Sequence, residues 1–154
     1  MNRKRAKRGD VFAIPYKAGD GFVLGVVVAN NSFGTAYLLV NKVFEALPSS
    51  IDAFSPILKY PIYSDEKSIK NERWQYLFHD EDILLEYQTA PEIFHSPKYN
   101  PQYGPYGLGE TPDGEIRNLS KAEADELGLL SGDYSQALTS EEIEQFIALK
   151  IVNG

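Results

Sequence analysis

The chain has 154 residues, of which 43% are hydrophobic and 24% are charged, and these proportions are typical of one ordinary globular domain. It contains no cysteine, which excludes a disulfide framework, a thiolate metal site and a cysteine nucleophile. Its longest apolar run, residues 22–29, is far shorter than the roughly 20 residues of a membrane-spanning helix, and no apolar signal-peptide core follows the basic start. We therefore expect a cytoplasmic protein without membrane contacts.

The net charge of −7 is unevenly distributed along the chain. Residues 1–8 hold five Lys or Arg and no acid, so the remainder has ten basic residues against twenty-two acidic ones, or −12. A body this acidic repels nucleic acid and attracts a basic protein. We expect residues 1–8 to be a flexible basic tail and residues 9–154 to be a single domain.

In chain order, the first predicted elements are three strands at residues 9–15, 22–29 and 36–44. Both faces of these strands are apolar, as in strands that are buried inside a sheet or a small barrel. The glycines in residues 17–21 and 30–34 supply the positive φ that hairpin turns require. The sequence therefore predicts an antiparallel meander.

The next segment has weaker strand signals. Residues 46–54 are predicted to bridge two strands, and residues 56–63 are predicted to form an edge strand or a bulge. Pro61 supports an edge position because proline cannot donate a hydrogen bond to a sheet ladder. Residues 64–71 are predicted to be a charged loop.

An aromatic strand is predicted at residues 73–78. Its alternation places Trp74, Tyr76 and Phe78 on one face, and we interpret the single tryptophan as a core residue. The acidic residues that follow, 80–85, are predicted to form a loop or a single helical turn.

Residues 91–95 are predicted to form a short strand, and residues 115–119 one more strand. Between them, residues 96–114 contain several prolines, glycines and tyrosines and are predicted to be an irregular loop. A loop of this length is usually functional or mobile.

The last third of the chain is predicted to be helical. Ser120 and Glu123 have the spacing of a capping box, and Gly128 is expected to end that helix. Thr139 and Glu142 repeat the capping signal. The apolar residues that follow at helical spacing are Ile143, Phe146, Ile147 and Ile151. The chain is thus predicted to be α+β, with a twisted antiparallel sheet resembling an SH3-like partial barrel and two C-terminal helices.

Few residues suit catalysis or metal binding. The only histidines are His79 and His95, and the acidic run after His79 is typical of a solvated loop. No serine has the sequence context of a nucleophile elbow. We therefore expect no metal, no cofactor and no small-molecule substrate, and a hydrolase that uses His79 or His95 is an alternative. Nucleic-acid binding is disfavoured by the acidic body.

Protein binding fits the composition better. Acidic side chains steer a basic protein into contact, and tyrosines in a Gly/Pro-rich loop give rigid amphipathic contact area. An alternative role for the tyrosines is to attach the loop to the sheet. The candidate partner-binding residues are Asp65, Glu66, Asp80, Glu81, Asp82, Tyr99, Tyr103 and Tyr106.

The opening motif resembles a known family. Gly-Asp-Val-Phe-Ala-Ile-Pro at residues 9–15, a short Gly-containing loop and Gly-Val-Val-Val at residues 25–28 look like the start of the immunity protein 26 family of bacterial polymorphic-toxin systems. The tyrosine-rich segment, residues 99–106, departs from that family. Weaker similarity lies at Trp74, at residues 91–94, at the helix start in residues 119–123 and in the closing helix at residues 142–149.

This resemblance implies an inhibitor and not an enzyme. Such a protein binds a cognate toxin, often a nuclease, and blocks it in the cytoplasm of the producing cell; the family offers no catalytic residue to carry over. Residues 9–15 are assigned to the fold. The main alternative is a general protein- or peptide-binding module on a small β-barrel, without a toxin partner.

Overall fold

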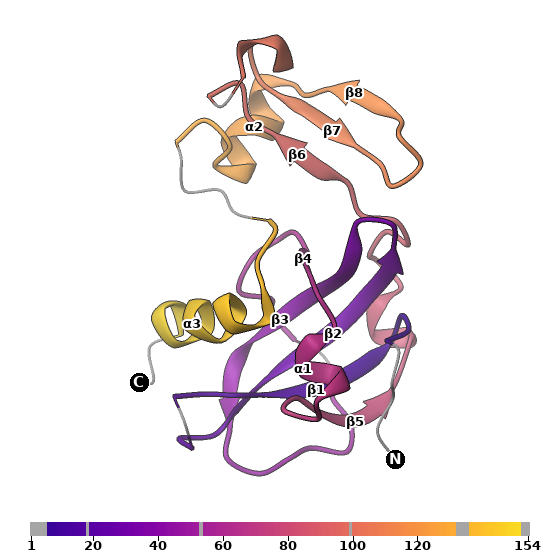
Figure 1. The fold of residues 1–154 in the computed structure, drawn as a ribbon, viewed down its shortest axis with the longest axis vertical. Coiled ribbons are helices and arrows are strands. Elements are labelled where there is room, and N and C mark those ends of the chain that lie inside the picture. The colour runs from indigo at the N-terminus through magenta and orange to yellow at the C-terminus, as the bar shows by residue number, and fades with distance from the viewer. Residues whose placement is uncertain (1–5, 18, 53, 99, 132–135, 152–154) are drawn as a thin grey trace.

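The computed structural model describes residues 6–17, 19–52, 54–98, 100–131 and 136–151. It contains a five-stranded sheet with the order β4-β3-β2-β1-β5 and a three-stranded sheet with the order β6-β7-β8. Neighbouring strands are antiparallel throughout, so the α+β prediction is confirmed, and neither sheet closes into a barrel. The two sheets lie one above the other (Figure 1).

We call these parts the large lobe, residues 6–92 and 136–151, and the small lobe, residues 93–131. The large lobe contains β1 (Asp10–Pro15), β2 (Phe22–Asn31), β3 (Gly34–Phe44), β4 (Ile62–Ser64), α1 (Lys67–Lys70), β5 (Gln75–His79), the 3₁₀ turn η1 (Asp82–Leu84) and α3 (Ser140–Lys150). The small lobe contains β6 (Ile93–His95), the 3₁₀ turn η2 (Pro101–Tyr103), β7 (Leu108–Glu110), β8 (Ile116–Asn118) and α2 (Lys121–Leu127).

The predicted N-terminal meander is confirmed in β1, β2 and β3. The first hairpin is closed by a hydrogen bond of 3.0 Å from the Tyr16 N–H to the Gly21 carbonyl. Gly34 opens β3 with a φ of +126°, and a Cβ there would lie 2.8 Å from the Ser64 carbonyl oxygen. Only glycine suits that position, which explains the turn signal in the sequence.

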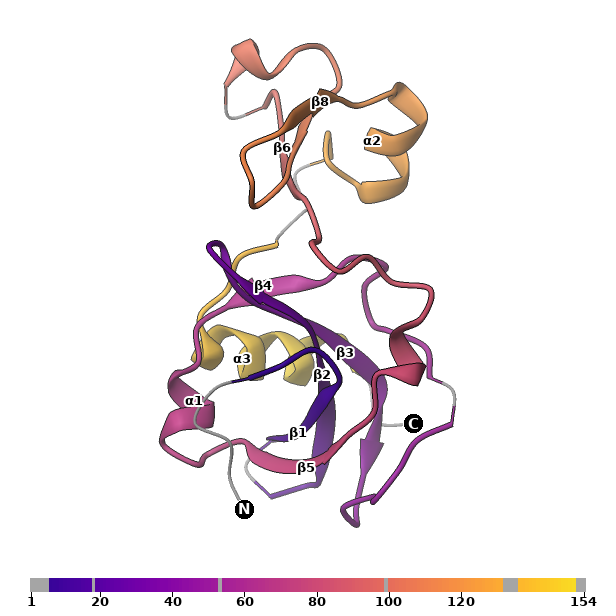
Figure 2. The same ribbon diagram turned by 90° about the vertical axis from the view of Figure 1, so that its right-hand side faces the viewer.

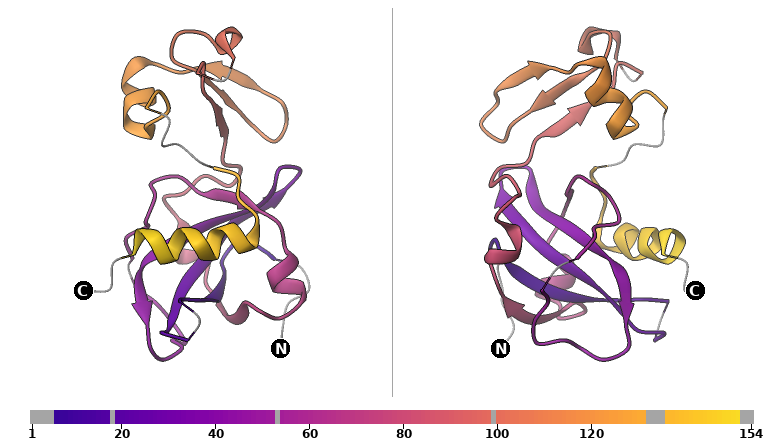
Figure 3. Two further views of the ribbon diagram at one scale, coloured as in Figure 1. Left: turned by 60° about the vertical axis from the view of Figure 1, so that its left-hand side comes forward. Right: turned by 180° about the vertical axis from the view of Figure 1, so that it is seen from behind.

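Both faces of the large sheet are buried, as the apolar strands predict. On one face, Phe12 and Ile14 pack with Ile143 and Ile147 of α3. On the other face, Val11 belongs to a separate apolar cluster that is covered by segments following β3 and β5. Figure 2 shows α3 on one side of the strands and the segment after β5 on the other, and Figure 3 shows α3 lying across the sheet.

Helix α3 begins as predicted. The Thr139 hydroxyl accepts from the Glu142 N–H at 3.1 Å while the Glu142 carboxylate accepts from the Thr139 N–H at 3.0 Å. Ile143, Ile147 and Ile151 are buried, as the helical spacing indicated. The helix is therefore held by apolar contacts along its whole length, and its cap only fixes where it starts.

The aromatic face predicted for residues 73–78 is wrong in part. A bulge in β5 pairs Tyr76 with Phe12 and Phe78 with Val11, leaving Leu77 as the extra residue. Trp74 and Tyr76 consequently contact the α3 side of the sheet, while Phe78 lies in the cluster on the opposite face. A bulge adds a residue without any sequence signature of its own, so alternation misassigned the last aromatic.

Two other segments differ from the predictions. Residues 56–63 do not form one strand: Pro56 makes an isolated bridge to Val40, and β4 covers only residues 62–64. Residues 64–71 are not entirely loop, since the short helix α1 lies within them. In both segments long-range pairing and packing decide a local structure that has too few residues to show a period.

The small lobe corrects the prediction of an irregular loop at residues 96–114. This segment contains η2 and β7, and β7 is the central strand of the second sheet. The strand predicted at 115–119 is confirmed as β8, and the capping box of Ser120 and Glu123 is confirmed at α2. Gly128 ends α2 with a φ of +69°, as expected.

The core of the small lobe is separate from that of the large lobe. It is built on Leu119, Ala124 and Leu129. The expectation that residues 9–154 form one domain stays a prediction, which amide hydrogen exchange in the two lobes would test.

Part of the predicted flexible tail belongs to the packed body. Ala6 is buried, and Arg8 donates hydrogen bonds to main-chain carbonyls of the large lobe. The rest of the tail, residues 1–5, lies outside the described residues.

Candidate functional site

Two of the predicted partner-binding acids have structural roles. Asp65 accepts hydrogen bonds from the Ser140 N–H and hydroxyl, at 3.3 and 2.9 Å. Glu66 accepts from the Asn30 side-chain amide and, at 3.1 Å, from the Thr35 hydroxyl. These carboxylates attach α3 and the β2–β3 hairpin to the segment that follows β4.

The acids after β5 are arranged differently. Asp80 accepts the Asp82 N–H at 3.0 Å, which forms the turn into η1. The Glu81 side chain is 62% exposed, and Asp82 is also exposed. Asp80, Glu81 and Asp82 therefore form one acidic surface segment, as predicted.

The described tyrosines among the candidates pack within the small lobe. The Tyr103 ring lies 5.0 Å from the His95 ring, centroid to centroid. Tyr106 packs against the small core around Leu129. These contacts agree with the alternative that the tyrosines attach the segment to its sheet, and Tyr99 lies outside the described residues. The seven described candidates consequently do not form one surface.

His79 makes an orienting contact with a buried acid. Its Nδ1 lies 2.8 Å from Oδ1 of Asp10, which is fully buried, and Asp10 also accepts the Lys7 N–H at 2.9 Å. The ring is 34% exposed, and its Nε2 lies 4.0 Å from a Glu81 carboxylate oxygen. This geometry could hold a general base, because a carboxylate fixes the orientation of the imidazole.

His95 contacts Glu110 across the β6–β7 pair, with 2.8 Å between Nε2 and Oε1. Within the described ranges, no serine or threonine hydroxyl is hydrogen-bonded to either histidine ring. No group of three His, Asp or Glu side chains in the described part of the chain is placed to hold a metal ion. Among the described residues, neither histidine therefore has a nucleophilic hydroxyl or a set of metal-binding side chains beside it.

Leu85 is the most exposed apolar residue near the acids, and it is not among the residues that the sequence predicted to bind a partner. Its exposed fraction is 80%, whereas the preceding Leu84 is completely buried under the large sheet. The sequence signal was the apolar run at residues 83–85 inside an acidic segment. A run of three cannot show which residue faces water, because that depends on how η1 docks on the sheet.

The loop that carries Leu85 is held by Arg8. The Arg8 guanidinium donates to the carbonyls of Leu84 and Tyr87, at 2.7 and 2.8 Å. It also donates to the carbonyls of Gln88 and Val28, at 3.1 and 3.0 Å. One guanidinium thus joins the loop to β2, and Leu85 protrudes from a loop whose backbone is fixed on both sides.

Leu85 borders a hollow of about 330 Å³. The Phe54 and Tyr87 rings stack there with centroids 6.4 Å apart. No Lys or Arg is among the described residues that line it, and the carboxylates of Asp52, Asp82 and Glu86 form no ion pair with another described residue. We call this the Leu85 surface: Asp52, Phe54, Asp82, Ile83, Leu85, Glu86 and Tyr87.

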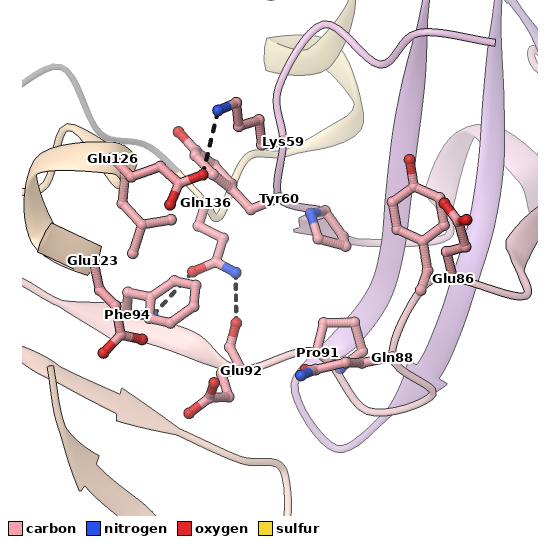
Figure 4. A pocket seen from close by; sticks show the side chains of 13 residues that line it. Lys59, Tyr60, Glu86, Gln88, Pro91, Glu92, Phe94, Glu123, Glu126 and Gln136 are labelled. Atoms are coloured by element: carbon pink, nitrogen blue, oxygen red, sulfur yellow. Dashed lines mark hydrogen bonds and ion pairs between the residues drawn. The ribbon is translucent and has the colours of Figure 1, made fainter. Parts of the chain in front are cut away.

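A second hollow of about 380 Å³ lies between the lobes and shares Glu86 and Tyr87 with the Leu85 surface. Figure 4 shows Glu123 and Glu126 of α2 on one side of it and Glu86 on the other. Gln136 also lines this hollow, and its side chain donates a hydrogen bond to the Glu92 carbonyl at 2.6 Å and accepts one from the Phe94 N–H at 3.0 Å. This interlobe groove is lined by Lys59, Tyr60, Pro61, Glu86, Tyr87, Gln88, Pro91, Glu92, Phe94, Glu123, Glu126, Leu127 and Gln136.

The acids of the interlobe groove differ in how they are neutralised. Arg117 binds Glu92 through two hydrogen bonds, of 2.8 and 3.0 Å, and Glu123 through one of 2.8 Å. The hydrogen bonds to Glu92 raise the pKa of Arg117. Lys59 contacts Glu126 at 3.3 Å, and both side chains are largely exposed. Glu86 forms no ion pair within the described part of the chain.

Comparison with protein-family models, with curated proteins and with solved structures found no match for this chain. None of the helices formed by the described residues has the length and apolar character needed to cross a lipid bilayer.

Proposed function

We propose that this chain is a cytoplasmic immunity protein that binds a basic toxin domain in a stoichiometric complex and neutralises it. The observation that carries the proposal is the Leu85 surface, where a leucine that is 80% exposed lies among carboxylates that form no ion pair with another described residue. Burying such a side chain in a complex contributes about 1.5–3 kcal/mol. The surrounding acids favour a basic partner and raise the rate of association.

The hydrogen bonds from Arg8 to the carbonyls of the loop around Leu85 support a binding role for this loop. A loop that is ordered before binding loses less conformational entropy in the complex, so more of the contact energy appears as affinity. Arg8 fixes the carbonyls of Leu84 and Tyr87 on either side of Leu85 and Glu86. The apolar anchor and its acidic neighbour are therefore presented in one defined arrangement.

The class of partner comes from the resemblance of residues 9–15 to the immunity protein 26 family. A toxin that acts on nucleic acid presents a basic surface, and an acidic binding surface complements it. A general protein-binding module would use the same surface, but its partner would have no toxic activity.

The test is capture by the tagged full-length protein from a lysate of its own source, followed by co-expression with the captured partner. We expect one stoichiometric basic partner whose expression alone stops growth and whose co-expression with this chain restores it. Leu85→Asp should weaken the complex at least about tenfold, as expected for an apolar anchor.

Leu149→Asp is the matched control, because Leu149 is also 80% exposed but lies on α3. It should leave capture and growth rescue unchanged. Equal behaviour of the two variants, or a partner without toxicity, would contradict the proposal.

The Asp10–His79 pair supports one other candidate, a hydrolase. Its test is an assay of the purified chain against ester, peptide and nucleic-acid substrates, with His79→Ala as the comparison. Activity that disappears in the variant would favour the hydrolase over the inhibitor.

A further inference from the structure

We infer that the interlobe groove binds an extended basic segment of the partner, with one cationic side chain at each end of the groove. This inference rests on the proposed function for the source of the segment, but its chemistry follows from the groove itself. Glu86 of the large lobe and Glu126 of the small lobe are the carboxylates that receive the two cations (Figure 4).

The groove already holds a cation at one end. The Lys59 ammonium lies 3.3 Å from the Glu126 carboxylate, with 77% and 62% of the two side chains exposed. An exposed ion pair of this kind is weak and exchangeable, because each side chain is well solvated. A guanidinium from a partner can share or replace this contact with two parallel hydrogen bonds, which an ammonium cannot form.

At the other end of the groove, none of the described Lys or Arg side chains pairs with the carboxylate. Glu86 makes no ion pair with another described residue, and the adjacent Tyr87 ring lines the same hollow. Tyr60 and Phe94 add two more aromatic side chains to the lining. Aromatic faces beside carboxylates favour an organic cation, since the ring quadrupole attracts the positive charge that the acid also binds.

The other acids of the groove are unsuited to this role because they are already engaged. Glu92 and Glu123 share Arg117, and Glu123 also accepts the Ser120 N–H at 3.1 Å to cap α2. The two carboxylates that remain for a ligand, those of Glu86 and Glu126, therefore lie on different lobes. A ligand that meets both must be elongated, which favours an extended segment over a compact ion.

The volume and the lining agree with this occupant. About 380 Å³ is near the lower end of the range of roughly 300–1,000 Å³ that is usual for ligand pockets, so the groove suits a few side chains. Its wall continues into the Leu85 surface through Glu86 and Tyr87. A partner seated on Leu85 can thus place a neighbouring segment in the groove.

The experiment uses synthetic peptides with two arginines separated by one to five Gly or Ser residues, titrated into the full-length protein by calorimetry. The reference peptide has citrulline in place of both arginines, which keeps the shape and removes the charge. We expect one spacing to bind best and the citrulline peptide to bind at least about threefold more weakly.

The protein variants distinguish binding of the peptide in the groove from non-specific attraction to the acidic surface of the protein. Glu86→Gln with Glu126→Gln should weaken the best peptide by about three- to tenfold. Glu45→Gln with Glu115→Gln changes the net charge equally at exposed positions outside the groove and should leave binding unchanged. Equal losses in the two double variants, or equal affinity for the citrulline peptide, would overturn the groove as a site.

The same variants distinguish this inference from the proposed function. If the peptides fail to bind while Leu85→Asp still abolishes capture of a toxin, the groove is refuted and the immunity function stands. If the peptides bind with a preferred spacing but no captured partner is toxic, the groove stands and the immunity function is refuted.

Discussion

The large and small lobes are built by different means. The large lobe has a five-stranded sheet with an apolar cluster on each face, whereas the small lobe has a three-stranded sheet and, among its described residues, three buried core residues. Each strand of the small sheet is three residues long. A small apolar core contributes little stability, so capping hydrogen bonds and ion pairs must supply a larger share in the small lobe.

The polar contacts of the small lobe illustrate this difference. Arg117 of β8 joins Glu92, the large-lobe residue directly before β6, to Glu123 of α2. The side chain of Gln136, which lies shortly before α3, forms hydrogen bonds with the backbone of Glu92 and Phe94. The two walls of the interlobe groove are therefore held by different contacts: the large-lobe wall mainly by apolar packing, and the small-lobe wall mainly by a few hydrogen bonds and ion pairs.

The largest effect is expected for Trp74→Ala in the large lobe. Trp74 is buried, its ring meets Tyr37 edge-on at 5.5 Å, and its indole N–H donates to Glu144 at 3.1 Å. The loss should be about 3–5 kcal/mol of unfolding free energy. Urea denaturation followed by circular dichroism measures it. A loss below about 1 kcal/mol would show that the apolar clusters do not carry the stability of this lobe.

The next largest effect is expected for Gln136→Ala between the lobes. The Gln136 side chain is buried, and its removal leaves the Glu92 carbonyl and the Phe94 N–H without that partner, at a cost of about 1–3 kcal/mol. Hydrogen exchange should accelerate in residues 93–131 much more than in β2. Equal acceleration in both places would mean that the lobes open together, as the single-domain prediction implies.

Two helix caps provide a matched pair with smaller effects. Ser120→Ala removes the cap of α2 in the small lobe, and Thr139→Ala removes that of α3, at about 1 kcal/mol each. We expect Ser120→Ala to speed amide exchange throughout α2. Thr139→Ala should affect only the first turn of α3, because buried Ile143 and Ile147 hold the rest. A uniform response along both helices would remove the distinction between the lobes.

The smallest effect is a pH dependence of the small lobe. The pKa of Glu123 is lowered, first by the backbone N–H of Ser120 and then by the side chain of Arg117. Since the folded-state pKa lies below the ordinary value of about 4.3, the stabilisation is present above that pH and disappears as the pH falls through the folded-state pKa. The NMR amide shifts of α2 should therefore change as the pH falls below the ordinary carboxyl pKa.

Glu123→Gln is the control for this titration. Its amide oxygen can still accept the Ser120 N–H, but it carries no charge that titrates. The acid-induced shift changes at Ser120 and Arg117 should be much smaller in this variant. Unchanged titration of those residues would assign the pH dependence to another carboxylate.

The sequence alone determined the elements that depend on local geometry. The hairpin at Gly34 needs a positive φ, and the starts of α2 and α3 are set by hydroxyl–carboxylate pairs three residues apart. The buried meander also followed from the sequence, because both faces of its strands are apolar. These signals lie within a few residues of the structure that they specify, so neighbouring residues suffice to identify them.

The candidate site depends on contacts between residues that are far apart in the sequence. Arg8 and the loop that it binds are about 80 residues apart in sequence. Leu84 and Leu85 are adjacent and chemically identical, and the way in which η1 packs on the sheet buries the first and exposes the second. Strand β7 forms because β6 and β8 flank it, since three residues with a central glycine carry no strand period. The groove likewise exists only because the second sheet stands beside the first. Each of these features is a long-range contact, which the local chemistry of the chain permits but does not specify.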